Sequence, residues 1–240
     1  MPDSIVHGTL ATGAAKEIAS TVDGRLKIDA DYSGTTEDAF GRLRVSHPLT
    51  LFDSSHRFTD NNLWVSSLTT GGTATFNSSQ GLVDNAVTAA SGSEVIRETK
   101  KAFAYQPGKS LLVMNTFVFA AAKTGLRQRV GYFGAENGIY LQQDGTQISL
   151  VLRSKVSGSV VNTVVNQSSW NQDVLDGTGS SGITLDLTKA QIFWLDLEWL
   201  GVGTVRCGFI INGKFIHCHS FNHANVISST YITTACLPIR

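Results

Sequence analysis

Asp196 and Glu198 stand two positions apart in the strand-like segment QIFWLDLEWL, residues 191–200. A β-strand repeats every two residues, so we expect both carboxylates on one face together with Trp194, and the apolar residues between them on the other face. Paired carboxylates act as acid and base, or as acid and nucleophile, in enzymes that cleave sugars. The strand face that carries Asp196 and Glu198 is therefore the first candidate for chemistry.

The same segment resembles the catalytic strand of the jelly-roll glucanases, in which a Glu, an Asp and a second Glu alternate with apolar residues. The position of the first Glu, the nucleophile of those enzymes, is Trp194 here. A retaining glycosidase without its nucleophile does not turn over by that route, so we expect no catalysis. One interpretation of this face is then an exposed acidic strand whose Asp196 pairs with Arg206 on the next strand.

A second interpretation is a glycan site. Such sites usually combine an exposed aromatic ring with acidic or amide groups. Trp194 beside Asp196 and Glu198 has this combination, and Trp170 precedes a polar, Gly-rich loop. Both tryptophans are therefore candidate glycan platforms.

Two further segments carry residue types that bind metals. In HCHSFNH, the two-residue strand period predicts His217 and His219 on one face, with His223 nearby. The motif holds no carboxylate, and His223 is separated from the pair by three residues. We therefore interpret the histidines as polar residues at a rim or an interface. We expect no metal at these histidines.

The loop NQDVLDGTGSSG, residues 171–182, offers Asp173 and Asp176 as calcium ligands. It lacks the alternating acidic residues and closing Glu of a calcium-binding hand. An ordinary surface loop is expected there. No phosphate-binding loop, dinucleotide fingerprint or Ser-His-Asp signature is found in the sequence, so we expect no cofactor.

Composition narrows the class of protein. Lys and Arg total 19 and Asp and Glu total 19, and charged residues make up 16% of the 240-residue chain. Nucleic acid is not expected as a partner, because phosphate binding needs a basic surplus. No apolar run approaches the roughly 20 residues of a membrane-spanning helix, so we expect no membrane insertion and synthesis in a cytoplasm. The three cysteines fit no zinc or disulfide spacing and are expected to be free thiols.

Strand patterns fix the expected fold. From residue 109 onward, short apolar or alternating runs follow one another at turn-sized intervals, which predicts an all-β antiparallel β-sandwich, a concanavalin-like jelly roll. Asn137-Gly138, Asp144-Gly145 and Asn212-Gly213 predict two-residue hairpins. We divide the chain into an extended N-terminal arm (residues 1–36), a connecting segment with strands (37–101) and the jelly-roll domain (102–240).

The segments GRLKI and GRLRV, residues 24–28 and 41–45, repeat one alternating pattern outside the predicted sandwich. A strand of this kind has a basic face and an apolar face, and it could add to the sheet edge of a neighbouring subunit. We predict docking strands there; the alternative is that both segments pair with their own domain. The docking residues are Arg25, Leu26, Ile28, Arg42, Leu43, Arg44 and Val45.

Several longer phrases resemble a family of uncharacterised tailed-bacteriophage virion proteins, common among marine and cyanobacterial phages. They include DAFGRLRVSHPLTLFDSSHRF, YQPGKS, the stretch from SSWNQDVLDGTG to FIHCHSFNH, and the closing LPIR. The resemblance runs from about residue 38 to the end, and the family couples an arm to a concanavalin-like or laminin-G-like jelly roll. It implies a structural protein located in the virion and made in the host cytoplasm.

Two functions follow from these patterns. The first is a non-enzymatic virion component, such as a head decoration, neck or tail-associated subunit, that binds copies of itself and other virion proteins. The second is a receptor-facing, lectin-like module of a phage tail or head fibre that binds host-surface glycans. We favour the first, because the arm has no obvious use in a free lectin. The exposure of Trp194 distinguishes the two.

Overall fold

The computed structural model describes residues 7–9, 15–17, 38–39, 42–43 and 49–240. The chain divides into two compact units, Met1–Ser33 and Gly34–Arg240. In the first unit, strands β1 (His7–Thr9) and β2 (Ala15–Glu17) pair antiparallel. Among the described residues, no helix is long and apolar enough to cross a membrane.

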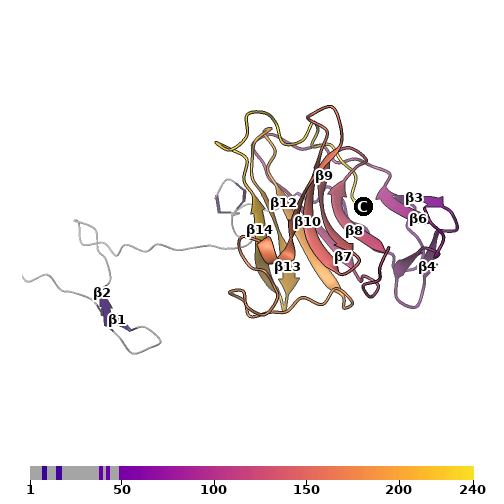
Figure 1. The fold of residues 1–240 in the computed structure, drawn as a ribbon, viewed down its shortest axis with the longest axis horizontal. Helices are drawn as coiled ribbons and strands as arrows, with labels where there is room; N and C mark the ends of the chain where they lie inside the picture. Colours follow the sequence, from indigo (N-terminus) through magenta and orange to yellow (C-terminus); the bar gives the residue numbers. More distant parts are fainter. Residues whose placement is uncertain (1–6, 10–14, 18–37, 40–41, 44–48) are drawn as a thin grey trace, which may run out of the picture. The chain divides into compact units, whose positions relative to one another are not determined.

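The second unit is built on two four-stranded antiparallel sheets that pack face to face (Figure 1). We call them the first and the second sheet. The first sheet has the order β11 (Val161–Asn166), β10 (Gln147–Ser154), β9 (Gly138–Asp144), β8 (Arg127–Phe133). The second sheet has the order β14 (Lys214–Phe221), β13 (Val205–Ile211), β12 (Gln191–Leu197), β7 (Leu111–Phe117). The predicted all-β class and antiparallel sandwich are confirmed.

Two of the three predicted hairpins are two-residue turns. Asn212 and Gly213 join β13 to β14 with φ angles of 52° and 75°, the backbone that matches the twist of the flanking strands. Gly145 and Thr146 join β9 to β10. The third prediction is wrong in length, because the loop between β8 and β9 spans residues 134–137 and Gly138 already pairs in β9.

The core lies between the two sheets and follows the predicted strand periods. Phe193 and Leu195 of β12 and Phe209 of β13 are buried there against Leu141 and Leu150 of the first sheet. Each such side chain contributes about 1.5–3 kcal/mol when it is removed from water. The predicted inward face of residues 191–200 is therefore confirmed.

The segment 237–240 joins the sandwich to the rest of the unit. Gly131 and Arg240 exchange backbone hydrogen bonds of 2.9 and 3.0 Å, so the segment pairs with β8. On its other side, the N–H groups of Thr99 and Phe103 donate to Ile239 and Leu237 (both 2.9 Å). The first sheet thus continues through this segment to the end of β6.

Two antiparallel strand pairs precede the sandwich in the chain, and the second is a hairpin inserted between the two strands of the first. Strand β6 (Glu94–Thr99) pairs with β3 (Trp64–Thr69), and β4 (Thr73–Asn77) pairs with β5 (Leu82–Ala86). They stand beside β8 in Figure 1, in indigo and purple. Within the described part of residues 37–101, strands therefore occur at 64–69, 73–77, 82–86 and 94–99.

Tyr132 holds the closing segment in place. Its buried hydroxyl lies 2.6 Å from the carbonyl oxygen of Phe103 and 2.7 Å from that of Ala235, and it accepts the N–H of Leu237 at 3.1 Å. One side chain therefore satisfies backbone groups of two segments that flank β8.

Replacing Tyr132 by Phe is expected to lower the free energy of unfolding by about 2 kcal/mol, because buried backbone groups lose their partner. Tyr140 is the matched control: it is equally buried, and its hydroxyl has no hydrogen-bond partner. Tyr140→Phe should change the unfolding free energy by less than about 0.5 kcal/mol. Urea unfolding of the two variants measures this, and equal losses would contradict the assigned role of Tyr132.

Candidate functional site

The face of β12 that carries Trp194 is covered. Trp194 is 0% exposed, and its indole lies against Phe215 and His217, with ring centroids 5.9 and 5.8 Å away. Its ring N–H lies 3.3 Å from the carbonyl oxygen of Phe209. A Cβ atom on Gly208 would approach the indole to 2.8 Å, so a glycine is needed there. The expectation of an exposed face is wrong, and Trp194 offers no open platform in this structure.

Asp196 and Glu198 share this face and have different environments. Asp196 is 0% exposed and accepts from the guanidinium of Arg206 at 2.5 Å, which is the pairing that the sequence predicted. Glu198 is 1% exposed, and its buried Oε1 has no hydrogen-bond partner among the described residues. A buried carboxylate oxygen without such a partner is costly, so protonation is favoured.

Burial, together with the nearby carboxylates of Asp38 and Asp196, raises the pKa of Glu198 to about 7. The guanidinium of Arg42 opposes this rise. Glu198 is thus a protonated acid at mildly acidic pH, next to a carboxylate held in an ion pair. This is a difference in charge state that glycosidases use, but here both groups lie beneath other side chains.

The described residues 38–39 and 42–43 belong to the same unit as this face. Arg42 forms an ion pair with Asp38 (2.7 Å) and donates to the carbonyl oxygen of Gly108 (2.9 Å). Leu43 is half exposed. The GRLRV segment therefore contacts its own domain through Arg42. The other predicted docking residues, Arg25, Leu26, Ile28, Arg44 and Val45, lie outside the described residues, and their docking stays a prediction.

A β-bulge separates the two histidines of the predicted pair. His217 aligns with Gly208 and His219 with Cys207, so Cys218 is the extra residue of β14. An inserted residue shifts the strand period by one. His217 therefore lies beside Trp194 on the outer face, whereas His219 turns inward and packs against Phe221 at 4.6 Å. The prediction that His217 and His219 share a face is wrong.

The carboxylates of the 171–182 loop accept hydrogen bonds from the same loop and stabilise it. Asp173 is buried and accepts from the N–H groups of Leu175 (2.9 Å) and Ser181 (2.7 Å) and from the hydroxyl of Ser180 (3.0 Å). Asp176 accepts from the N–H and the hydroxyl of Thr178. In the part of the chain that the structure describes, no three His, Cys, Asp or Glu side chains gather as metal ligands would.

Trp170, the other predicted glycan residue, belongs to the core. Its ring stacks on Phe209 with centroids 6.4 Å apart, and its ring N–H lies 3.3 Å from the carbonyl oxygen of Val165. Trp170 is buried. Like Trp194, it presents no exposed ring.

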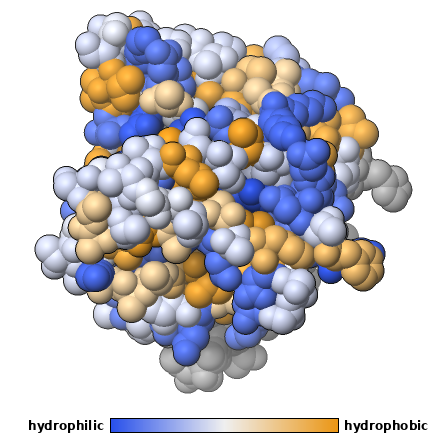
Figure 2. Space-filling view, turned by 90° about the vertical axis from the view of Figure 1, so that its right-hand side faces the viewer, coloured by the Kyte–Doolittle hydropathy of each residue, from blue (hydrophilic) through white to orange (hydrophobic). Residues whose placement is uncertain are grey.

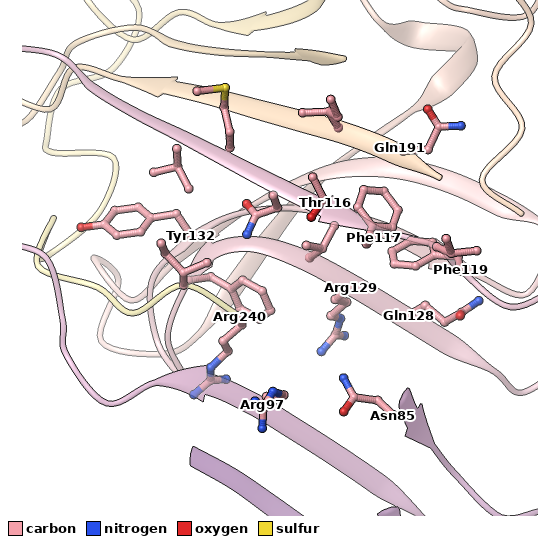
Figure 3. Close-up of a pocket in the computed structure, with 18 of the residues that line it drawn as sticks. Asn85, Arg97, Thr116, Phe117, Phe119, Gln128, Arg129, Tyr132, Gln191 and Arg240 are labelled. Atoms are coloured by element: carbon pink, nitrogen blue, oxygen red, sulfur yellow. The ribbon is translucent and has the colours of Figure 1, made fainter. Parts of the chain in front are cut away.

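A large groove, which the sequence did not predict, runs between the β7 edge of the sandwich and the strand pairs β3–β6 and β4–β5. Its volume is about 3850 Å³, and all of β7 lines it. Figure 3 shows Phe117 and Phe119 near one wall and Arg129, Arg97 and Arg240 on the other. These arginines come from β8, β6 and the closing segment, so only the tertiary structure brings them together.

Two of the three arginines in this wall form ion pairs. Arg97 pairs with Asp60 (2.7 Å) and Arg240 with Glu98 (2.6 Å), whereas Arg129 donates to the neutral amide of Gln142. Apolar and hydrophilic patches alternate on the side of the molecule that carries strands β3 to β6 (Figure 2). The groove can therefore accept a mixed apolar and polar surface.

A second hollow, of about 760 Å³, lies between β14, β10 and the segment 227–231. It contains His219, His223 and Tyr231, and none of the residues that line it is Asp, Glu, Lys or Arg. We call it the histidine pocket. It lies on the opposite side of the sandwich from β7, since β11 and β14 border it and β8 borders β7.

Compared with models of protein families, with curated proteins and with solved structures, the chain matches none of them. The resemblance to phage virion proteins therefore stays a prediction.

Glu198→Gln is expected to remove a loss of stability at high pH. The pKa of Glu198 in the folded protein, about 7, is above its ordinary value, so the folded state binds the extra proton and stability falls as pH rises through 7. Between about pH 5 and about pH 8, the free energy of unfolding should fall in the wild type by on the order of 1 kcal/mol more than in the variant. Urea unfolding at both pH values measures it.

The same change at exposed Glu94 serves as control and should leave the wild-type pH profile intact. Parallel pH profiles for the wild type and Glu198→Gln would show that this carboxyl is not held protonated by the fold.

Proposed function

We propose that this chain is a non-enzymatic structural component of a tailed-bacteriophage virion, such as a head decoration, neck or tail-associated subunit. Its partners would be copies of itself and other virion proteins, joined by the addition of a strand to a sheet edge. The sequence resemblance supports the virion setting. The groove beside the open edge of β7 is the observation that carries the assembly mode.

The groove suits a macromolecule better than a small ligand. Pockets for small molecules usually measure about 300–1000 Å³, and this groove measures about 3850 Å³. It also contains a complete strand edge, because β7 is the last strand of its sheet and pairs only with β12 among the described strands. An extended peptide could bind there through main-chain hydrogen bonds.

The β14 edge of the same sheet, unlike the β7 edge, is covered by residues 171–172. At β14, the side-chain amide of Asn171 accepts from the N–H of Ser220 (2.9 Å) and donates to its carbonyl oxygen (2.9 Å), as a neighbouring strand would. The backbone N–H of Gln172 also donates to the carbonyl oxygen of Cys218 (3.0 Å). Uncovered edges are positions where proteins pair with one another. Edge β7 therefore has the chemistry of a strand acceptor, and much of edge β14 is already occupied.

A docking strand of the GRLKI type fits such an edge. In an added strand, Leu26 and Ile28 would share one face and could pack on Phe117 and Phe119, which line the groove. Arg25 and Lys27 would then point to the opposite face. Affinity would come from the main chain and a few apolar contacts, without a deep pocket.

Met114→Lys is expected to weaken this assembly. Met114 lies at the middle of β7, on the face opposite Phe117, and is 53% exposed, so lysine is tolerated by the fold but places a positive charge beside the basic face of the docked strand. Val164→Lys on β11, the other uncovered edge, is the matched control, since Val164 is 51% exposed. Light scattering after size exclusion should show a smaller mass for Met114→Lys alone. Equal masses for all three proteins would exclude β7 as the acceptor.

Removal of residues 1–36 tests the donor. A chain that starts at Glu37 is expected to be monomeric under conditions in which the full chain is an oligomer, because the docking strand at residues 24–28 is lost. The same scattering measurement applies. A full chain that is itself monomeric at high concentration would contradict self-assembly and would favour the receptor-facing glycan-binding module as the function.

A further inference from the structure

The histidine pocket has the size and the neutrality of a site for a small uncharged ligand. Its volume of about 760 Å³ falls within the usual range for small-molecule sites. Leu152, Phe221 and Ile227 supply apolar surface, and the remaining lining is rich in hydroxyl groups, with the amide of Asn222. A charged ligand would find no opposite charge there.

The backbone fixes the proton position on His219. The N–H of Asn171 donates to its Nδ1 at 3.2 Å, so Nδ1 carries the lone pair and Nε2 carries the proton. Burial lowers the pKa of His219 to about 4, which keeps the ring neutral at pH 7. His219 Nε2 is therefore a hydrogen-bond donor.

His223 has the opposite arrangement. Its Nδ1 lies 2.7 Å from the carbonyl oxygen of Gly203, which can only accept, so Nδ1 carries the proton. Burial lowers the pKa of His223 as well, and its ring is held flat against Tyr231 with centroids 3.9 Å apart. His223 Nε2 is therefore an acceptor.

The two rings offer complementary groups to one pocket. Within the described part of the chain, neither His219 Nε2 nor His223 Nε2 has a hydrogen-bond partner. A hydroxyl group both donates and accepts, so neighbouring hydroxyls on one ligand can satisfy both nitrogens. A metal ion fits less well, because the Nε2 of His219 already holds a proton.

We propose that the histidine pocket binds a neutral polyhydroxylated ligand, a pyranose ring of a glycan, with His219 as donor and His223 as acceptor. Leu152, Phe221 and Ile227 contact the C–H face of the sugar. The site lies away from β7 and does not depend on assembly. It assigns glycan binding to residues other than Trp170 and Trp194, neither of which lines this pocket.

The experiment titrates the full chain with the methyl glycosides of glucose, galactose, mannose and N-acetylglucosamine. Long-range ¹H–¹⁵N spectra report on each imidazole nitrogen. At least one glycoside should shift the Nε2 signals of His219 and His223 in a saturable manner. The spectra also test the assigned proton positions. If no glycoside moves either signal, the proposal is overturned.

Variants give the second measurement. His219→Phe and His223→Phe should each weaken binding about tenfold or more, the cost of one lost hydrogen bond of roughly 1.4 kcal/mol. His217→Phe, on the other face of the same strand, is the matched control and should bind like the wild type. Methyl glucuronide, which is charged, should bind more weakly than methyl glucoside. Tighter binding of the glucuronide, or unchanged binding by both variants, would overturn the assignment.

If a phenylalanine variant fails to fold, His219→Gln replaces it, since glutamine keeps a donor of similar reach. A glutamine amide both donates and accepts, so His219→Gln and His223→Gln should each keep measurable binding of the best glycoside. The roles of donor and acceptor are tested by the wild-type spectra, where an unprotonated His219 Nε2 or a protonated His223 Nε2 would contradict them.

Discussion

The larger unit depends on the backbone pairing of the segment 237–240. The segment is paired on both sides, with β8 of the sandwich and with residues 99–103 that lead out of β6. These strands are far apart in the chain, so their pairing closes a long loop, which is entropically costly. Tyr132 adds a buried anchor at the same seam. Without this seam, the strand pairs β3–β6 and β4–β5 would lose their backbone hydrogen bonds to the sandwich, and the groove would lose one wall.

Local pattern predicted what depends on local geometry. The alternation in residues 191–200 gave the inward Phe193 and Leu195, and Asn212-Gly213 gave a two-residue hairpin, because side-chain period and turn backbone are set within a few residues. The outer face of the same strand was not predictable in this way. Trp194 is covered by Phe215 and His217 of another strand, and no periodicity within residues 191–200 reports on that cover.

The histidines show a second limit of pattern. A strand period assigns His217 and His219 to one face, but one bulged residue moves them apart. A bulge has no firm signature in the sequence of β14 itself. The proton positions of His219 and His223 depend on Asn171 and Gly203, which the fold brings to them from other segments. Chemical character at these residues is therefore a property of the tertiary structure.

The cover of β14 by Asn171 also limits how such a protein can polymerise. With that edge capped, the sandwich has one open edge on each sheet, at β7 and at β11, on opposite sides. Contact between β7 of one copy and β11 of the next would be head-to-tail, and head-to-tail contacts continue into rings or filaments. A short donor strand that pairs with the β7 edge offers no β11 edge of its own, so no further copy can be added there. Growth would then be limited to a defined number of copies.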